Sequence, residues 1–313
     1  MSCNIYQINS AVSRISIQRI THSGISVSEF TAEFLKIASA DRRAGTMKIY
    51  KSALSKFIDM TTDIPLDEVT ARHYDKFKSM RAVAVRPVTV NIDLRALRAA
   101  FQTAVRWKYL AKNPFEDTRL IPVPQTEKPF IRQDDFPRLI SAIQEPWMRD
   151  IVFFAALTGL RREELICLTK ADYDVANKQV VIKSNANFKT KNGKMRVVPL
   201  DPAAQYIVQS HIELNQSKYL FYLDGGIQIS GDYLTHKFKK YVRLVGLGED
   251  IHLHSLRHTY ASWLVQNGAN LFQVQRLLGH GCITTTQVYA HLSMNELRSA
   301  VLNLPDFKEL YDG

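Results

Sequence analysis

The sequence predicts a mainly α-helical protein with one small antiparallel β-sheet, divided into two domains. Apolar residues recur at helical spacing along most of the chain. Two short β-branched segments, at 178–184 and 195–200, flank Asn192-Gly193, and Asn-Gly is the dipeptide most typical of a tight hairpin. A proline-rich stretch without periodicity separates a helical N-terminal part from the rest of the 313 residues, which suffice for two separate cores.

Four helices are expected in the N-terminal part. They begin after Ser26, behind a Thr46 cap, after Thr70 and near Pro87. Their apolar stripes are Val27, Phe30, Phe34, Ile37 and Ala38; Met47, Tyr50, Leu54, Phe57 and Ile58; Tyr74, Phe77 and Met80; and Val90, Leu94, Leu97, Phe101 and Ala104. The pattern predicts a compact four-helix domain at 24–118, preceded by an N-terminal arm at 1–23.

A linker at 119–130, which contains Pro122, Pro124 and Pro129, is expected to join this domain to a second one at 131–293. The second domain should hold both strands and most of the remaining helices. Those helices are predicted at 134–144, 147–158, 202–215, 232–245, 255–267 and 270–278, with a last one at 294–303 in a C-terminal tail, 294–313.

The composition excludes several classes of protein. Hydrophobic content of 46% and charged content of 23% are ordinary for a soluble globular chain and argue against extensive disorder. The longest apolar run, 151–157, is too short to span a bilayer. The N-terminus lacks a signal-peptide pattern, and three cysteines without a CxxC motif fit a reducing compartment. We therefore expect a cytoplasmic protein.

The charge of the chain favours a polyanionic partner. Forty-one Lys and Arg against 30 Asp and Glu give a net charge of +11. Residues 1–120 hold 19 basic and 11 acidic side chains, so the excess is concentrated in the N-terminal part. Arg95 and Arg98 lie off the apolar stripe of the fourth helix and give it a basic side. A solvated basic surface and a nucleic-acid contact both explain this pattern.

The segment "HLHSLRHTYASWL" places His254 and Arg257 three residues apart at a helix start, on one side of the helix. His254 and His258, four apart, also raise the possibility of a zinc helix. The glutamate of an HExxH motif is missing, however, because Ser255 occupies its position, and no third ligand is evident. A surface His-Arg pair would be the simplest explanation if this motif stood alone.

Three further motifs accompany it. "TGLRREEL" puts Arg161 after a Thr-Gly turn, with Glu164 one helical turn later. "KTKNGKMRVVPL" puts Lys191 at the tip of the predicted hairpin. "LLGHGCITTTQVYAHL" puts His280 nine residues ahead of Tyr289. Each signal is weak when taken alone, since ion pairs, turn lysines and core tyrosines are common, but their order and spacing are specific.

Together these motifs resemble those of the tyrosine recombinases, the phage-integrase family. The resemblance covers essentially the whole of 24–303 and is densest in 158–165, 189–200 and 254–292. The family's catalytic set is an arginine in a TGxR turn, a hairpin lysine, an HxxR pair, a histidine in LGH and a tyrosine nine residues beyond. The matching positions are Arg161, Lys191, His254, Arg257, His280 and Tyr289. Lys194 is a rival hairpin lysine, but Lys191 lies eight residues before Pro199, as the family lysine does.

The resemblance implies a phosphoryl-transfer mechanism. Tyr289 would be the nucleophile, forming a 3′-phosphotyrosyl link that stores the energy of the broken bond and leaves a free 5′-hydroxyl. Arg161 and Arg257 would stabilise negative charge on the non-bridging oxygens of the transition state. Because such cationic side chains do the work that a metal ion would otherwise do, no metal or cofactor is expected.

The remaining positions would carry supporting roles by the same resemblance. Lys191 would protonate the departing 5′-oxygen as general acid. His254 would assist proton transfer at the tyrosine, and His280 would hydrogen-bond a phosphate oxygen. Glu164 would orient Arg161 or the neighbouring helices.

The resemblance also implies an architecture and partners. It predicts a two-domain, C-shaped DNA clamp in which a helical, SAM-like core-binding domain contacts duplex DNA through Arg95 and Arg98. Monomers in solution would assemble into a homotetramer on specific core sites and pass through a Holliday junction, with the tail at 294–313 exchanged between protomers. An accessory directionality factor is a further possible partner.

About 23 residues precede the helical domain, which favours a simple, Xer-like recombinase without a separate arm-binding domain. Two rivals stay open at this point. A type IB topoisomerase uses nearly the same residues for nicking and closing, and a non-catalytic DNA-binding regulator could keep the fold.

Overall fold

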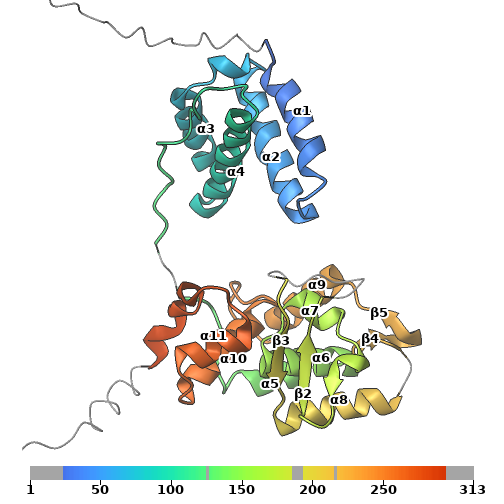
Figure 1. Ribbon diagram of the computed structural model, residues 1–313. Helices are drawn as coiled ribbons and strands as arrows, with labels where there is room; N and C mark the ends of the chain where they lie inside the picture. Colours follow the sequence, from blue (N-terminus) through green and yellow to red (C-terminus); the bar gives the residue numbers. More distant parts are fainter. Residues whose placement is uncertain (1–23, 125–126, 185–192, 215–216, 294–313) are drawn as a thin grey trace, which may run out of the picture. The chain divides into compact units, whose positions relative to one another are not determined.

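The computed structural model describes residues 24–124, 127–184, 193–214 and 217–293. The chain separates into two compact units, Met1–Gln125 and Thr126–Gly313, and the division falls within the stretch predicted as a linker. Figure 1 shows an all-helical first unit and a second unit that combines helices with short strands. In the part of the chain that the structure describes, no helix is both long enough and apolar enough to cross a membrane.

The first unit contains the four predicted helices and one short 3₁₀ helix. Their bounds are α1 Val27–Ala38, α2 Ala44–Thr61, η1 Leu66–Glu68, α3 Ala71–Ala84 and α4 Pro87–Arg106. The Ser26 cap of α1 is confirmed, because its side chain accepts from Glu29 N and the Glu29 side chain accepts from Ser26 N. The predicted Thr46 cap of α2 is wrong. Helical hydrogen bonding already begins at Arg43, whose carbonyl accepts from Met47 N, so Thr46 lies inside the helix.

An aromatic core holds this unit together. Phe101 of α4 is fully buried, and its ring centroid lies 4.4 Å from Phe115, 5.8 Å from Phe57 and 6.1 Å from Phe30. These partners come from α1, α2 and the loop that follows α4, so one side chain joins three segments. Burying such rings against one another is the main stabilising term for a helical unit of this size.

The start of the predicted linker is attached to the first unit, and the residue that directly follows the linker is anchored in the second. Asn91 of α4 donates from Nδ2 to the carbonyl of Ile121 at 2.8 Å and accepts from Ile121 N at 2.9 Å. In the second unit, Ile131 is buried, its N–H donates to Thr259 Oγ1 at 2.9 Å, and its carbonyl accepts from Trp263 Nε1 at 3.1 Å. The unattached part of the linker is therefore shorter than the sequence indicates.

The second unit is mainly helical, as predicted. Its helices are α5 Phe136–Ala142, α6 Pro146–Thr158, α7 Arg162–Ile166, η2 Lys170–Asp172, α8 Pro202–Leu214, η3 Asp224–Gly226, α9 Gly231–Leu244, α10 Ser255–Gln266, α11 Leu271–Leu278, η4 Ile283–Thr285 and η5 Gln287–Ser293. Its strands are β1 Tyr173–Asp174, β2 Gln179–Ile182, β3 Arg196–Pro199, β4 Tyr222–Leu223 and β5 Ile227–Gln228. The helix predicted at 294–303 lies outside the described residues.

The predicted antiparallel pair is present, with Val180 opposite Val198. The structure adds β1 on the other edge of β2 and a separate two-stranded sheet, β4–β5, which the sequence analysis missed because these strands are only two residues long. Both strands are slightly shorter than predicted, since β2 ends at Ile182 and β3 begins at Arg196, and Asn192-Gly193 lies between them as expected. Asn192 itself lies outside the described residues.

Replacing Phe101 by alanine should lower the unfolding free energy of the first unit by about 3–5 kcal/mol, because the cavity would adjoin three aromatic partners. Urea unfolding followed by the fluorescence of Trp107 measures this, in a background where Trp147 and Trp263 are changed to phenylalanine. Val83→Ala is the control, since Val83 is 92% exposed and should change stability by no more than about 0.5 kcal/mol. Equal effects of the two changes would show that the aromatic core is not the stabilising element.

Candidate active site

The turn between α6 and α7 places Arg161 at the edge of the second unit. Helix α6 ends at Thr158, and Gly159 follows with φ +62°, a left-handed conformation that favours glycine. A Cβ at Gly159 would lie 2.4 Å from Cδ1 of Tyr260 in α10, so the turn also needs glycine for close packing. Arg161 then occupies the N-cap position of α7, with its side chain 24% exposed.

A buried carboxylate fixes Arg161 in place. Glu164 is 2% exposed, and it accepts from the backbone N–H of Arg161 at 2.8 Å and from Arg161 Nη1 at 2.9 Å. It also accepts from Arg196 Nη1 at 2.8 Å and Nη2 at 2.6 Å. Burial alone would raise the pKa of Glu164, but the hydrogen bonds and charge of Arg196, aided by Arg161, outweigh it and lower the pKa to about 2. Glu164 thus orients Arg161, as expected, and also binds a second arginine.

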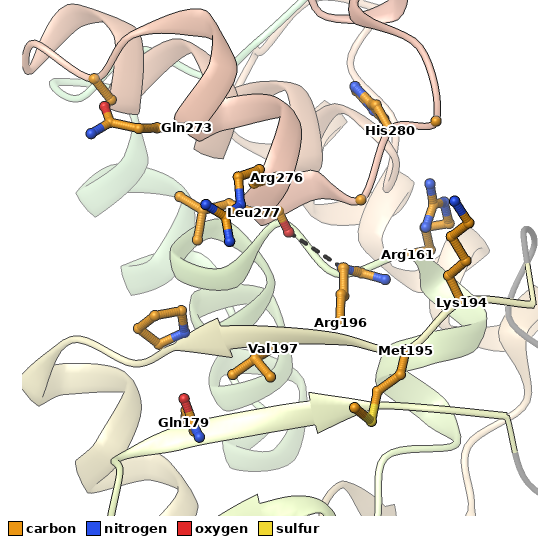
Figure 2. Close-up of a pocket in the computed structure, with 14 residues that line it drawn as sticks. Arg161, Gln179, Lys194, Met195, Arg196, Val197, Gln273, Arg276, Leu277 and His280 are labelled. Atoms are coloured by element: carbon orange, nitrogen blue, oxygen red, sulfur yellow. Dashed lines mark hydrogen bonds between the residues drawn. The ribbon is translucent and has the colours of Figure 1, made fainter.

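That second arginine, Arg196, was missed by the sequence analysis. It lies in β3 opposite Ile182, and its Nε also donates to the carbonyl of Leu277 at 3.3 Å, the contact drawn in Figure 2. A Cβ at Gly279 would lie 2.6 Å from Arg196 Cδ, so Gly279 allows the arginine to pass. The sequence did contain a signal for Arg196. Residues 196 and 198 lie on the same face of the strand, and Val198 is buried there. An arginine on a buried face requires a carboxylate partner.

Arg257 of α10 connects two of the motif turns. It is 3% exposed, and it donates from Nη1 to the carbonyl of Gly159 at 2.7 Å and from Nη2 to the carbonyl of Leu278 at 2.5 Å. Burial lowers its pKa to about 9, and the charges of Arg161 and Arg196 act in the same direction. Arg257 therefore remains a cation at neutral pH and brings the Arg161 turn next to the turn that carries His280.

His280 follows Gly279, which ends α11 with φ +65°. Its Nδ1 lies 2.9 Å from the hydroxyl of Thr286, a fully buried residue. Burial lowers the pKa of His280 to about 4, with further contributions from the charges of Arg257 and Arg161. The imidazole is neutral at neutral pH, and its contact with Thr286 leaves Nε2 as the nitrogen that can meet a ligand.

Tyr289 is buried beneath α10, 2% exposed, in a small apolar cluster with Val265 and Leu278. Its hydroxyl lies 2.5 Å from Nδ1 of His258. Burial raises the pKa of Tyr289 to about 12, opposed by the charge of Arg257. The histidine expected at the tyrosine was His254, and the structure shows that His258 also has a place there, in contact with the hydroxyl.

His254 occupies the N-cap position of α10, where it is exposed, and its ring centroid lies 5.1 Å from that of His258. The zinc alternative for these two histidines gains no support, since no group of three or more metal-ligating side chains occurs among the described residues.

An open groove of about 1000 Å³ runs between β3 and the end of α11. Figure 2 shows the side chains that line it. Five of the residues that line it are basic or can become so: Arg161, Lys194, Arg196, Arg276 and His280. The groove is wide and cationic, which suits an extended anion better than a small ligand. Lys191 lies outside the described residues.

The two arginines predicted to contact DNA differ in their surroundings within the first unit. Arg95 is exposed on α4. Arg98 is half-buried, and its guanidinium donates to the carbonyls of Phe115 at 3.1 Å and of Thr118. These bonds hold the loop that carries Phe115 into the aromatic core, so Arg98 has a structural role that the sequence did not indicate.

Changing Glu164 to glutamine should lower the unfolding free energy by about 3 kcal/mol at pH 7, because it removes the charge that binds two arginines. The pKa of Glu164 is depressed from 4.5 to about 2 in the folded chain, so this stability is complete above about pH 4.5 and is lost as the pH falls toward 2. The difference in unfolding free energy between Glu164→Gln and the wild type, measured by urea titration, should therefore become smaller between pH 5 and pH 3.5.

Glu163→Gln makes the same change of charge at an exposed neighbour and serves as its control. It should cost less than about 1 kcal/mol. A loss of unfolding free energy in Glu164→Gln that does not depend on pH would contradict the role of this carboxylate as the charge that binds both arginines.

Comparison with known protein families identifies two matching models. The model described as the phage integrase family matches residues 129–296, and that of the phage integrase SAM-like domain matches 26–120. Among similar proteins, tyrosine recombinase XerA of Saccharolobus solfataricus is 26% identical over 82% of this chain and 86% of its own length. Tyrosine recombinase XerC of Oceanobacillus iheyensis is 27% identical over 82% and 88%.

Solved structures show a similar fold. The Tn1549 transposon integrase, in complex with transposon right end DNA, matches with a TM-score of 0.75 and 22% identity over 90% of this chain and 99% of that one. A lambda integrase tetramer bound to a Holliday junction matches with a TM-score of 0.72 and 17% identity over 89% and 83%. With more than half of its residues matched by the family's own model, this chain belongs to the phage integrase family.

Proposed function

We propose that this protein is a site-specific tyrosine recombinase that cleaves and rejoins duplex DNA through a 3′-phosphotyrosyl intermediate and a Holliday junction. The observation that carries the proposal is the convergence of three of the four motifs at Arg257. Its guanidinium bonds the carbonyl of Gly159 beside Arg161 and the carbonyl of Leu278 beside His280, and its charge acts on Tyr289. The two relatives described above are both named tyrosine recombinases.

The phosphate of the scissile bond would bind between cationic side chains. Arg161 lines the groove and is rigidly held by Glu164, while Arg257 is buried behind it and charged. Forked guanidinium groups fit the non-bridging oxygens of a phosphate, where negative charge accumulates in the transition state. His280 is oriented by Thr286 so that Nε2 can donate to the same oxygens. No divalent metal is required for this step, because fixed cations supply the charge.

Tyr289 is the nucleophile in this proposal. Attack of its hydroxyl oxygen on phosphorus forms the tyrosyl ester and releases the 5′-oxygen, which later attacks back to rejoin a strand. The energy of the broken bond stays in the ester, so the cycle needs no ATP. Glu164 and Arg196 act as positioning residues, since they touch Arg161 and the end of α11 rather than the reacting atoms.

The general acid for the leaving oxygen is a lysine of the β2–β3 connection. Spacing to Pro199 favours Lys191, whereas Lys194 is exposed and lines the groove together with Arg161. We assign Lys191 to proton transfer and Lys194 to binding of the DNA backbone, because one flexible lysine suffices as acid and a second adds charge to the groove.

The first unit would serve as the core-binding domain, with Arg95 rather than Arg98 contacting the DNA backbone, since Arg98 is engaged by the loop after α4. Four protomers would assemble on paired core sites. The tail at 294–313, which lies outside the described residues, would be exchanged between neighbours and close the ring.

Changing Tyr289 to phenylalanine should preserve DNA affinity within about twofold and abolish covalent protein–DNA adducts. The probe is a duplex enriched from a random library by binding to the Tyr289→Phe protein, then synthesised with a nick beside each candidate scissile phosphate. Denaturing gels measure the adduct in EDTA and without ATP. The wild type should also give branched junctions and recombinant strands from two such duplexes.

Adducts at normal yield in Tyr289→Phe would remove this tyrosine as nucleophile. Relaxation of supercoiled plasmid irrespective of sequence, without strand exchange, would identify a topoisomerase instead, and binding without cleavage by the wild type would identify a regulator.

Lys191→Ala and Lys194→Ala separate the two hairpin lysines. Loss of Lys191 should slow cleavage by about 10²- to 10⁴-fold, and a 5′-bridging sulfur in the probe should restore the rate, because a thiolate leaves without being protonated. Lys194→Ala should weaken binding of the DNA and make that binding less dependent on salt concentration. Its cleavage rate at saturating protein should stay within about threefold of the wild-type rate. Sulfur rescue of Lys194→Ala instead of Lys191→Ala would reverse the assignment.

A further inference from the structure

The hydroxyl of Tyr289 meets a histidine that the family-type motif set does not include. His258 lies in α10, one turn beyond His254, and Tyr289 lies in η5. The two elements pack together, and Nδ1 of His258 lies 2.5 Å from the phenolic oxygen. The backbone N–H of Tyr289 donates to the carbonyl of Thr286 at 3.0 Å, and its ring belongs to the apolar cluster with Val265 and Leu278. A backbone hydrogen bond and apolar packing therefore hold Tyr289 against His258.

The protonation of this pair follows from its surroundings. Burial raises the pKa of Tyr289 to about 12, so its phenol is protonated at neutral pH. Burial likewise lowers the pKa of His258 to about 3, so its imidazole is neutral. A neutral imidazole has one acceptor nitrogen, and a phenol at hydrogen-bond distance donates to it. Nδ1 is then the acceptor, and the ring proton is on Nε2.

A nucleophilic phenol must lose its proton as it attacks, and the residue that takes the proton has to be within contact distance. We propose that His258 is a catalytic residue, the general base that accepts the proton of Tyr289 when the tyrosine attacks the scissile phosphate. This inference rests on the proposed function and deepens it, since it moves the base from His254 to His258.

Cleavage moves one proton on each side of the phosphorus atom. The O–H bond of Tyr289 breaks and its proton moves to Nδ1 of His258, while the phenolic oxygen forms a bond to phosphorus. The bond from phosphorus to the 5′-oxygen breaks, and that oxygen takes a proton from Lys191. In rejoining, the 5′-hydroxyl returns its proton to Lys191 as its oxygen forms a bond to phosphorus. The bond from phosphorus to the phenolic oxygen breaks, and Nδ1–H returns the proton to the departing phenolate. His254, exposed and with its ring 5.1 Å from that of His258, is placed to exchange the proton with solvent.

Bound DNA would strengthen this base. Besides burial, the groups that disfavour a charged His258 are cationic or can become so: His254, Lys128, His252 and Arg257. They come from α10, the segment before it and the end of the linker. A phosphate held by Arg257 adds negative charge beside these groups and so raises the pKa of His258. Proton transfer is then favoured only when substrate fills the site, and the free protein keeps its nucleophile protonated.

Two substitutions distinguish a base from a hydrogen-bonding support. Asparagine can accept the phenolic hydrogen bond near the position of Nδ1 but cannot take up the proton. On the enriched, nicked duplex we expect His258→Ala and His258→Asn both to slow single-turnover cleavage by about 10²- to 10⁴-fold, with DNA affinity unchanged within about twofold. Added imidazole should restore part of the rate of His258→Ala, and a 5′-bridging sulfur should not, because the defect lies on the side of the nucleophile.

The controls use the same protein and probe. His236→Ala removes an exposed histidine of α9 whose Nδ1 lies 2.8 Å from the carbonyl of Asp232, and it should cleave at the wild-type rate. A wild-type rate in His258→Asn would overturn the proposal and leave His258 as a support. Undiminished cleavage by His258→Ala would overturn it entirely.

A measurement without DNA tests the contact itself. In protein labelled with 3-fluorotyrosine, the ¹⁹F signal of Tyr289 is the one lost in Tyr289→Phe, and it should shift in His258→Ala but not in His236→Ala. An unshifted signal would show that the pair is absent in solution. Different results would contradict the proposed function itself: covalent adducts in Tyr289→Phe, or no cleavage by the wild type.

Discussion

The carboxylate of Glu164 is the interaction on which the rest of the site depends. It is the buried negative charge that offsets two guanidinium groups, and each of its oxygens accepts more than one hydrogen bond. Through Arg161 it orients the turn after α6. Through Arg196 it connects α7 to β3 and to the carbonyl of Leu277 at the end of α11. Segments far apart in the chain therefore share one ionic centre.

The positive charges of the site divide its side chains into two chemical kinds. Arginines stay charged even when buried, so Arg161 and Arg257 can meet an anion without a change of protonation. The same charges, together with burial, keep His258 and His280 neutral. Neutral imidazoles can accept or exchange protons at neutral pH, whereas imidazolium groups could only donate. In the proposed function, binding and proton transfer would thus be carried by different residue types.

Much of the fold could be predicted from the sequence, because helical periodicity is strong in segments such as Val90 to Ala104, where every residue of the predicted apolar stripe proved buried. The ends of elements were less predictable, as the start of α2 shows, since backbone hydrogen bonds can extend a helix past a preferred cap. Strands of two residues, such as β4, carry no periodic signal at all.

Some residues of the site could likewise be predicted from the sequence, and others could not. Motif spacing indicated Arg257 and His280, which the structure brings together through the turns they touch. The roles of Arg196 and His258 depend on contacts between distant segments, Glu164 with β3 and Tyr289 with α10. Spacing within one motif contains no information about such pairs. His258 was weighed only as a metal ligand, because its partner lies 31 residues further along the chain.

The two carbonyls that Arg257 satisfies have a consequence for anyone who wants an inactive form of this protein. Shorter side chains at this position would leave the carbonyls of Gly159 and Leu278 without their donors in a buried place, so the loops would rearrange. A loss of activity there would report damage to the scaffold as much as to the chemistry. Tyr289 offers a cleaner choice, because phenylalanine keeps the ring in its apolar cluster and removes a single oxygen.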